Sequence, residues 1–186
     1  DRMLPGAAIN NFIDKQLIIF EKTALERALP CIWDGFKKGH RQAFYAIRYK
    51  NYADTNDLER VVGAVKDITG YHHGGASLYN TLTGMASGYP GSNNIPLLEN
   101  DGNFGTRLLG GDDCSAPRYI STKLEKISHK IFRAEDDPLL DLTYVDGKPA
   151  EYKFFLPILC MLLVNGCQGI ATGFKSDIYQ YNPKDI

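Results

Sequence analysis

Two short helical patterns separated by a glycine-rich turn constrain the fold more than any other part of the sequence. Apolar residues recur at helical spacing from Leu58 to Ile68, and Gly70 ends that pattern. After the turn Tyr71–Gly75, a second helical pattern runs from Ser77 to Met85. Helix, tight turn and helix is the order of a helix-turn-helix, whose second helix can enter the major groove of duplex DNA. We therefore expect this unit at the centre of the fold.

The segment that follows predicts a β-hairpin wing and then a strand and a helix. Two glycine turns, Asp101–Gly105 and Leu109–Asp113, surround short extended pieces, as in the wing of a winged-helix domain. From Arg118 the sequence favours a strand followed by a helix over Glu125–Phe132. A single continuous helix with apolar positions from Ile120 to Ile131 is the alternative that the pattern leaves open.

Two further helices are expected nearer the N-terminus. An amphipathic pattern runs from Ile9 to Leu29 and stops at Pro30, and a second helix is predicted over Lys38–Tyr49 after a turn at Trp33–Gly35. The start of the second helix is basic, with four residues that share this character: Lys37, Lys38, His40 and Arg41. The plain interpretation of such a cluster is a solvated face of the helix.

A change in composition after Ala134 indicates a domain boundary. Leu139–Val145 is typical of a strand between turn-forming residues, and the apolar run Phe154–Val164 and the glycine turn Gly169–Gly173 follow it. We predict a mostly helical domain at residues 11–134 and the β-containing start of a second domain at residues 135–186. The expected fold class is α+β.

Charge and cysteine content bound the function only weakly. The formal net charge of −1 gives no global basic signature, so any surface that binds nucleic acid must be local. The four cysteines form no C-x-x-C pair, which favours reduced thiols in an intracellular protein over a zinc site. The longest apolar run is too short to cross a bilayer of about 30 Å, so we expect no membrane association. The chain begins at Asp1, and we expect it to be a fragment.

Tyr119 is the strongest candidate for a reactive side chain. It ends the polar stretch GGDDCSAPRY and follows Arg118 directly. A phenol with a pKa of about 10 is a poor nucleophile at neutral pH, and neighbouring cations favour its phenolate. Cations such as Arg27 and Lys37, together with His73, would also neutralise charge on a phosphodiester in the transition state. This set therefore suits reversible cleavage of a nucleic-acid strand.

The paired histidines and the glycine-flanked isoleucine each keep more than one interpretation. His72 and His73 could bind a metal, cap a helix or contact phosphate. No third ligand lies nearby, and a helix start favours phosphate contact by His73. Ile170 fits a tight strand turn, but an exposed isoleucine between glycines could also wedge into a base step and kink a duplex.

Several motifs in register resemble the breakage-reunion core of type IIA DNA topoisomerases, closer to the eukaryotic and large-virus enzymes than to bacterial gyrase. These motifs are ERALPCIWDGFKKGHRQ (Glu26–Gln42), YHHGGASL (Tyr71–Leu78), GSNNIPLLENDGNFGTRLLGG (Gly91–Gly111), SAPRYI (Ser115–Ile120) and LPILCMLLVNGCQGIATGF (Leu156–Phe174). The resemblance covers the chain from about Asn11 onward. It implies a winged-helix domain followed by the start of a tower domain.

The resemblance also implies roles for individual residues. Tyr119 would form a 5′-phosphotyrosyl link, with Arg118 as its catalytic neighbour and Arg27 and His73 holding the scissile phosphate or adjacent backbone. Ile170 falls on the position that intercalates and bends the cleaved segment. The other positions implied to contact DNA are Lys37, Lys38, Arg41, His72 and Ser77.

Three positions depart from the family pattern. Lys38 stands where the family usually has proline, which adds charge near the DNA path. Gly75 replaces a common acidic residue, so a water or metal contact made there is in doubt. Ala76 is not the serine that supports quinolone binding in gyrase-like enzymes.

The cofactors and partners that the resemblance implies involve regions beyond this sequence. Mg²⁺ would be bound by a TOPRIM domain and ATP by an ATPase domain, and neither domain's motifs occur here, so we expect no metal site in this chain and no activity of the fragment alone. The partners implied are double-stranded DNA and a second copy, in a homodimer where Tyr119 of one subunit works with the metal site of the other. The implied location is intracellular: the nucleus of a eukaryotic cell, or the host cytoplasm or viral replication site.

Overall fold

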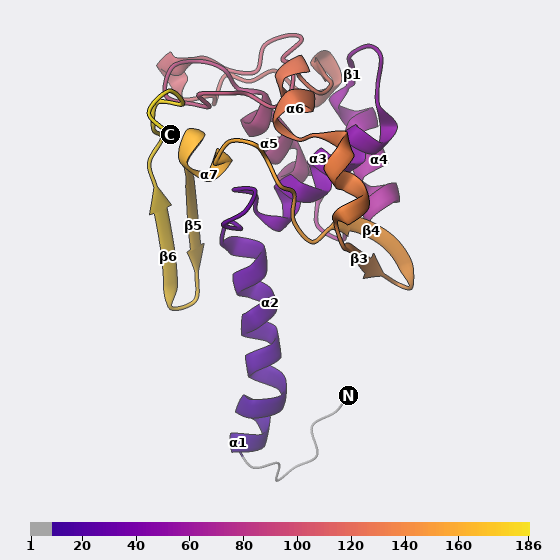
Figure 1. Cartoon of the computed structure of the whole chain (residues 1–186), viewed down its shortest axis with the longest axis vertical. Helices are drawn as coiled ribbons and strands as arrows, with labels where there is room; N and C mark the ends of the chain where they lie inside the picture. The colour runs from indigo at the N-terminus through magenta and orange to yellow at the C-terminus, as the bar shows by residue number, and fades with distance from the viewer. Residues whose placement is uncertain (1–8) are drawn as a thin grey trace.

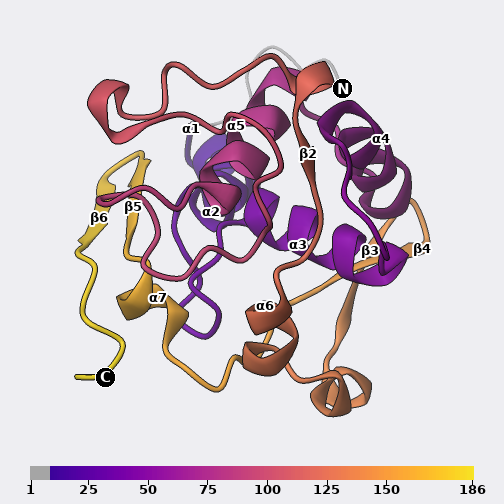
Figure 2. The ribbon, with the colours of Figure 1, turned by 90° about the horizontal axis from the view of Figure 1, so that it is seen from above.

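Three helices form the centre of the computed structural model, which describes residues 9–186. Helix α3 (Lys38–Lys50) packs against α4 (Leu58–Thr69) and α5 (Gly75–Ala86). Seen from above, α3 crosses the middle of the molecule with α4, α5 and α6 arranged around it (Figure 2). Gly70 ends α4 in the left-handed conformation at φ 60°, where a glycine carries no steric penalty. The predicted helix-turn-helix is therefore confirmed as α4–turn–α5.

The N-terminal helix projects from this body (Figure 1). It consists of α1 (Ile9–Phe12), a π-helical turn η1 (Ile13–Leu17) and α2 (Ile18–Ala28). Its extent agrees with the predicted helix. None of its side chains is buried, and Ile18, Ile19 and Phe20 are mostly exposed. Its amphipathic pattern therefore has no apolar partner within the described residues.

Within residues 9–186 the strands form three two-stranded antiparallel sheets. The pairs are β1 (Asn56–Asp57) with β2 (Ser121–Thr122), β3 (Leu142–Val145) with β4 (Lys148–Tyr152), and β5 (Cys167–Ala171) with β6 (Phe174–Ile178). The remaining helical segments are η2 (Arg107–Leu109), η3 (Pro117–Tyr119), α6 (Lys126–Ile131), η4 (Ala134–Leu139) and α7 (Met161–Val164). Helices and small sheets together confirm the α+β class.

The predicted hairpin wing over residues 101–113 is wrong. The segment forms irregular loop and the short helix η2, and among the described residues its only strand-like contact is a bridge from Asp101 to Ser121. Four of its glycines have positive φ, which breaks the extended conformation that a ladder needs. The carboxylate of Asp113 accepts the Thr106 N–H, and the Asn103 side chain donates to the Asp113 carbonyl. These polar side chains replace strand pairing.

The preference for a strand and then a helix after Arg118 is confirmed, with a later start. Arg118 and Tyr119 lie in the 3-10 turn η3, and the extended conformation begins only afterwards. The backbone carbonyl of Ile120 accepts the N–H of Leu58 at 3.1 Å, which ties this segment to the start of α4.

Aromatic rings join the helical body to the following segments. Phe44 lies 4.5 Å from Phe132 and 5.1 Å from Phe155, measured between ring centroids, and Phe36 stacks on Phe132 at 5.6 Å. All four rings are buried. Phe155 follows the proposed boundary at residue 135, so residues from both sides of it share this core.

A buried carboxylate fixes the turn before α3. Asp34 is fully buried and accepts hydrogen bonds from the backbone N–H groups of Phe36 and Phe155. It also pairs with Arg41 through Nε at 2.8 Å and Nη2 at 3.1 Å. The start of α3 is thereby tied to the segment that follows β4. In the described part of the chain, no helix is long and apolar enough to cross a membrane.

Candidate functional site

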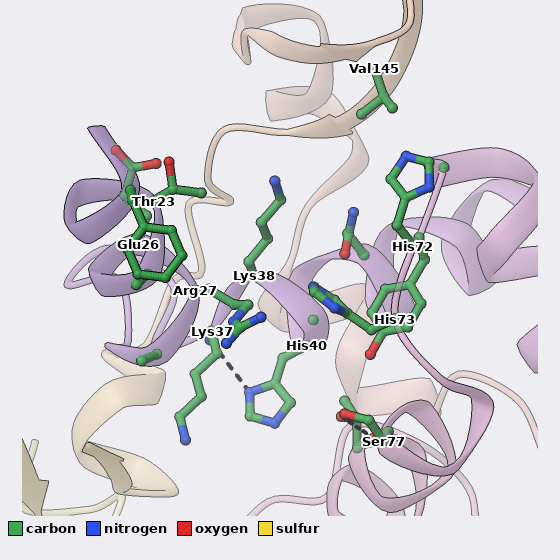
Figure 3. A pocket seen from close by; sticks show the side chains of 18 of the residues that line it. Thr23, Glu26, Arg27, Lys37, Lys38, His40, His72, His73, Ser77 and Val145 are labelled. Carbon is green, nitrogen blue, oxygen red and sulfur yellow. Dashed lines mark hydrogen bonds between the residues drawn. The ribbon is translucent and has the colours of Figure 1, made fainter. Parts of the chain in front are cut away.

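An open cavity of about 760 Å³ lies where α2, α3, α5 and β5 meet. It gathers seven of the predicted site residues: Arg27, Lys37, Lys38, His72, His73, Ser77 and Ile170. They come from four segments that are distant in sequence. Arg27 and His73 point into the cavity from opposite sides, whereas His72 points toward Val145 at the rim (Figure 3). The fold thus produces a cationic hollow in a chain of nearly neutral net charge.

The start of α5 adds to the anion-attracting character of the cavity. Its N-cap, Gly74, has no side chain to cap the first N–H groups of the helix. Such N–H groups and the helix dipole together favour a bound anion, and His72, His73 and Ser77 surround this helix end with exposed polar side chains. The ring of His73 is held edge-on against Tyr71, with centroids 5.3 Å apart.

His40 forms part of the cavity floor and is uncharged. Burial lowers its pKa to about 4, and the positive charges of Lys37 and Arg41 lower it further against the opposing effect of Asp34. Its Nδ1 accepts the backbone N–H of Lys37 at 3.4 Å, as part of the capping box at the start of α3. The expectation that His40 contributes to a basic face is therefore wrong. Its position three residues after the N-cap is the sequence signal for this role.

Arg41 lies inside the protein instead of on the cavity wall. Its side chain is buried, it forms the ion pair with Asp34 described above, and its Nη2 also donates to the Phe36 carbonyl. A guanidinium engaged in this way has a structural role and does not face a ligand. The geometry thus corrects the expectation that Arg41 contacts DNA and leaves Arg27, Lys37 and Lys38 as the cations of the cavity.

Tyr119 and Arg118 do not line the cavity. The side chain of Tyr119 is 69% exposed, and the Arg118 guanidinium lies over its ring with 4.9 Å between the guanidinium carbon and the ring centroid. Their segment is tied to the start of α4, whereas His72 and His73 follow the end of that helix. A helix of 12 residues is about 18 Å long, so the tyrosine and the histidines are at opposite ends of α4.

Cysteine and acidic side chains form no metal centre in the part of the chain that the structure describes. Residues 9–186 contain no group of three or more His, Cys, Asp or Glu side chains that could hold a metal ion. The four cysteines are free thiols. His72 and His73 therefore have no third ligand, and their geometry favours a contact with an anion.

Comparison with known proteins identifies the family. The family model that describes DNA gyrase/topoisomerase IV matches residues 27–186. The chain belongs to the type II DNA topoisomerase family. It is 45% identical over 177 residues to a probable DNA topoisomerase 2 of Dictyostelium discoideum, and the match covers 95% of this chain and 12% of that protein. The DNA topoisomerase 2 of Acanthamoeba polyphaga mimivirus is 44% identical over 177 residues, covering 95% of this chain and 14% of the viral protein.

A solved structure supports the same assignment to the type II topoisomerases. The DNA-binding, cleavage and re-ligation domain of Plasmodium falciparum topoisomerase II matches with a TM-score of 0.92 and 41% identity, covering 95% of this chain and 24% of that one. The relatives confirm the predicted similarity to eukaryotic and large-virus enzymes. The chain spans about an eighth of the curated relatives' length.

Proposed function

We propose that this chain forms part of the DNA gate of a type II topoisomerase, which cleaves both strands of a duplex, lets a second duplex pass and reseals the break. The observation that carries the proposal is the gathering of Arg27, Lys37, Lys38 and His73 in one open cavity, in a chain of this family. The exposed Tyr119 on a neighbouring segment supplies the nucleophile.

The proposed chemistry is a reversible transfer of one phosphodiester bond. The Tyr119 oxygen attacks a backbone phosphorus, a Tyr–O–P bond forms, and the bond from phosphorus to the 3′ oxygen breaks. The phenol gives up its proton and the leaving 3′ oxygen gains one. The product is a 5′-phosphotyrosyl link with a free 3′ hydroxyl. The reverse attack by that hydroxyl reseals the strand without an external energy source, because the ester linkage is conserved.

The separation of Tyr119 from the cavity suggests how a duplex would lie. The cavity cations and the start of α5 would hold backbone phosphates, with each neutralised phosphate adding to affinity. Tyr119, at the other end of α4, would reach a different phosphate of the same duplex. Ile170, 71% exposed at the cavity, would wedge into a base step and bend the DNA.

The cofactors and partners are proposed for the whole enzyme. The described residues offer no ligand set for Mg²⁺, so we assign that ion to a TOPRIM region and ATP to an ATPase region of the same enzyme. A homodimer would pair Tyr119 of each subunit with the metal site of the other. The enzyme would act in the nucleus of a eukaryotic cell, or in the host cytoplasm or viral replication site.

A winged-helix regulator that binds DNA without cleaving it is the second candidate. The helix-turn-helix α4–α5 favours it as strongly as it favours a DNA gate. It gives no reason for the exposed Arg118–Tyr119 pair, which a regulator does not need. An inactive structural component of a topoisomerase complex is a third candidate that shares this weakness.

Trapping of covalent complexes separates these functions. The full-length protein is mixed with Mg²⁺ and supercoiled DNA and denatured rapidly, and protein joined to 5′ DNA ends is measured. We expect adducts with the wild type and a loss to background with Tyr119→Phe. Equal adducts from both proteins would refute the assignment of the nucleophile. Absence of adducts and of relaxation with the wild type would favour the regulator or the inactive component.

A further inference from the structure

The hairpin β5–β6, which carries Ile170, is anchored at its base by amide hydrogen bonds. The Asn165 side chain accepts the Ile95 N–H at 2.9 Å and donates to the Ile95 carbonyl at 2.8 Å, as a strand neighbour would. The Gln180 side chain donates to the carbonyl oxygens of Asn165 and Ser92. This anchor joins the base of the hairpin to the loop after α5 and leaves its other end to be held elsewhere.

A second contact holds the middle of the hairpin against the end of α2. Gly169 is buried, and a Cβ at this position would lie 2.6 Å from the carbonyl oxygen of Ala28 and 3.3 Å from the Cα of Leu29. Both neighbours are backbone atoms, which cannot rotate away as a flexible side chain can. The two backbones thus approach to a distance that only glycine permits.

The paired strand contributes to the same interface. Ser176 is the partner of Gly169 in the β5–β6 register, and its Oγ would lie 2.9 Å from a Cβ at position 169. This hydroxyl is buried and has no hydrogen-bond partner among the described residues. The face of the hairpin that contains Gly169 and Ser176 is therefore packed tightly, with no room for an additional methyl group.

Strand geometry connects this contact to the direction of Ile170. Successive side chains of a strand point to opposite faces, so the docking of the Gly169 face on α2 turns the Ile170 side chain to the other, open face. The next residue after a buried glycine is accordingly 71% exposed. Arg27 lies in the last turn of α2, one residue before the carbonyl that Gly169 contacts.

We propose that Gly169 is a positioning residue that docks the hairpin on the end of α2 and thereby fixes Ile170 relative to Arg27. In a DNA gate, this contact would set the distance between the residue that wedges into the bases and a residue that holds the phosphate backbone. The inference rests on the proposed function for its effect on DNA. Its structural half, the docking of the hairpin, can be measured without DNA.

Gly169→Ala in the full-length protein is the direct test. The control is Gly63→Ala, because Gly63 is exposed on α4 and a Cβ there would meet nothing within 4 Å. Hydrogen exchange of the peptide covering residues 167–178 reports docking in the absence of DNA. End-to-end energy transfer in a labelled duplex reports bending, and trapped adducts report cleavage. Ile170→Ala provides the value for loss of the wedge alone.

We expect Gly169→Ala to accelerate exchange in the hairpin and to reduce bending to the level of Ile170→Ala. We also expect adducts to fall about tenfold, which corresponds to ~1.4 kcal/mol in the barrier. Gly63→Ala should match the wild type in all three measurements. If Gly169→Ala does not fold, Ser176→Val, which enlarges the opposite residue of the same interface, should give the same pattern.

The outcomes separate the inference from the proposed function. Hairpin exchange at the wild-type rate in both Gly169→Ala and Ser176→Val would overturn the docking. Bending that is equal in the wild type and Ile170→Ala would reject the wedge, and with it the effect of Gly169 on DNA. Faster exchange with bending unchanged from the wild type would overturn the positioning of Ile170 while leaving the DNA gate intact.

Discussion

His40 places an uncharged imidazole between two cations at the start of α3. Its pKa is lowered to about 4 in the folded protein, mainly by burial, from an ordinary value of 6.5. The unfolded chain therefore binds a proton at a higher pH than the folded one. The contribution of His40 to stability is fully present above pH 6.5 and decreases as the pH falls toward 4.

We predict that this group makes the protein about 1–2 kcal/mol less stable at pH 5 than at pH 7, a value reduced to allow for the partial exposure of the ring. The measurement is the free energy of unfolding in denaturant at both pH values, for the wild type and His40→Gln. Glutamine can still accept the Lys37 N–H but does not titrate, so it removes the His40 share of the pH dependence. Identical pH dependence in the two proteins would contradict the neutral assignment.

At the scale of single elements, the glycine-rich loop over residues 101–115 is expected to support the segment that carries Tyr119. The Ser115 N–H donates to the Asn103 carbonyl at 3.0 Å, and Asn103 Oδ1 accepts the Gly105 N–H at 3.0 Å. Gly105 has φ +92°, and a Cβ there would lie 2.5 Å from the Cα of Gly111. Any side chain at Gly105 would push the two arms of the loop apart.

We predict that Gly105→Ala destabilises the protein by about 2–4 kcal/mol, since it combines backbone strain with a clash between backbones. Gly110→Ala is the matched control: φ is +61°, but a Cβ there would meet nothing within 4 Å. It should cost only the strain of the left-handed conformation, about 1 kcal/mol. Thermal unfolding and limited proteolysis of the loop compare the two variants. Equal losses would show that the contact between Gly105 and Gly111 is unimportant.

The elements that could be predicted from the sequence are those that apolar periodicity defines. Helices α3 and α4 bury the residues that the helical spacing selects, including Phe44, Ile47 and Val65. The loop over residues 101–113 could not be predicted in the same way, because its conformation depends on positive φ angles and on Asn103 and Asp113 side chains that bond within the loop. Glycine spacing alone is compatible with both a hairpin and this loop.

Within the candidate site, sequence could identify the residues but not their surroundings. Arg41 and His40 belong to a basic cluster in the sequence, yet one is paired with the buried Asp34 and the other is uncharged. Burial by segments that are distant in sequence decides such cases. Gly169 is a comparable example, because its importance arises from the Ala28 carbonyl, about 140 residues earlier in the chain.

At the scale of the whole molecule, a formal net charge of −1 means that DNA affinity must come from the arrangement of charges. We predict that replacing Arg27, Lys37 and Lys38 together by glutamine weakens duplex binding by the full-length protein. Each phosphate contact contributes about −0.9 to the slope of log affinity against log salt, so the slope should become less steep by up to about 3. Binding titrations at several salt concentrations measure it.

A second triple variant with the same change in net charge provides the control. Lys126, Lys130 and Lys148 are exposed and lie outside the cavity, on α6 and β4. Their replacement by glutamine should leave the salt slope close to that of the wild type, because long-range charge is screened beyond about 8 Å at physiological salt. Equal reductions in both triple variants would mean that net charge determines binding. A reduction confined to the first variant would mean that the cavity built by α2, α3 and α5 holds the phosphates, since only there do the replaced cations lie together.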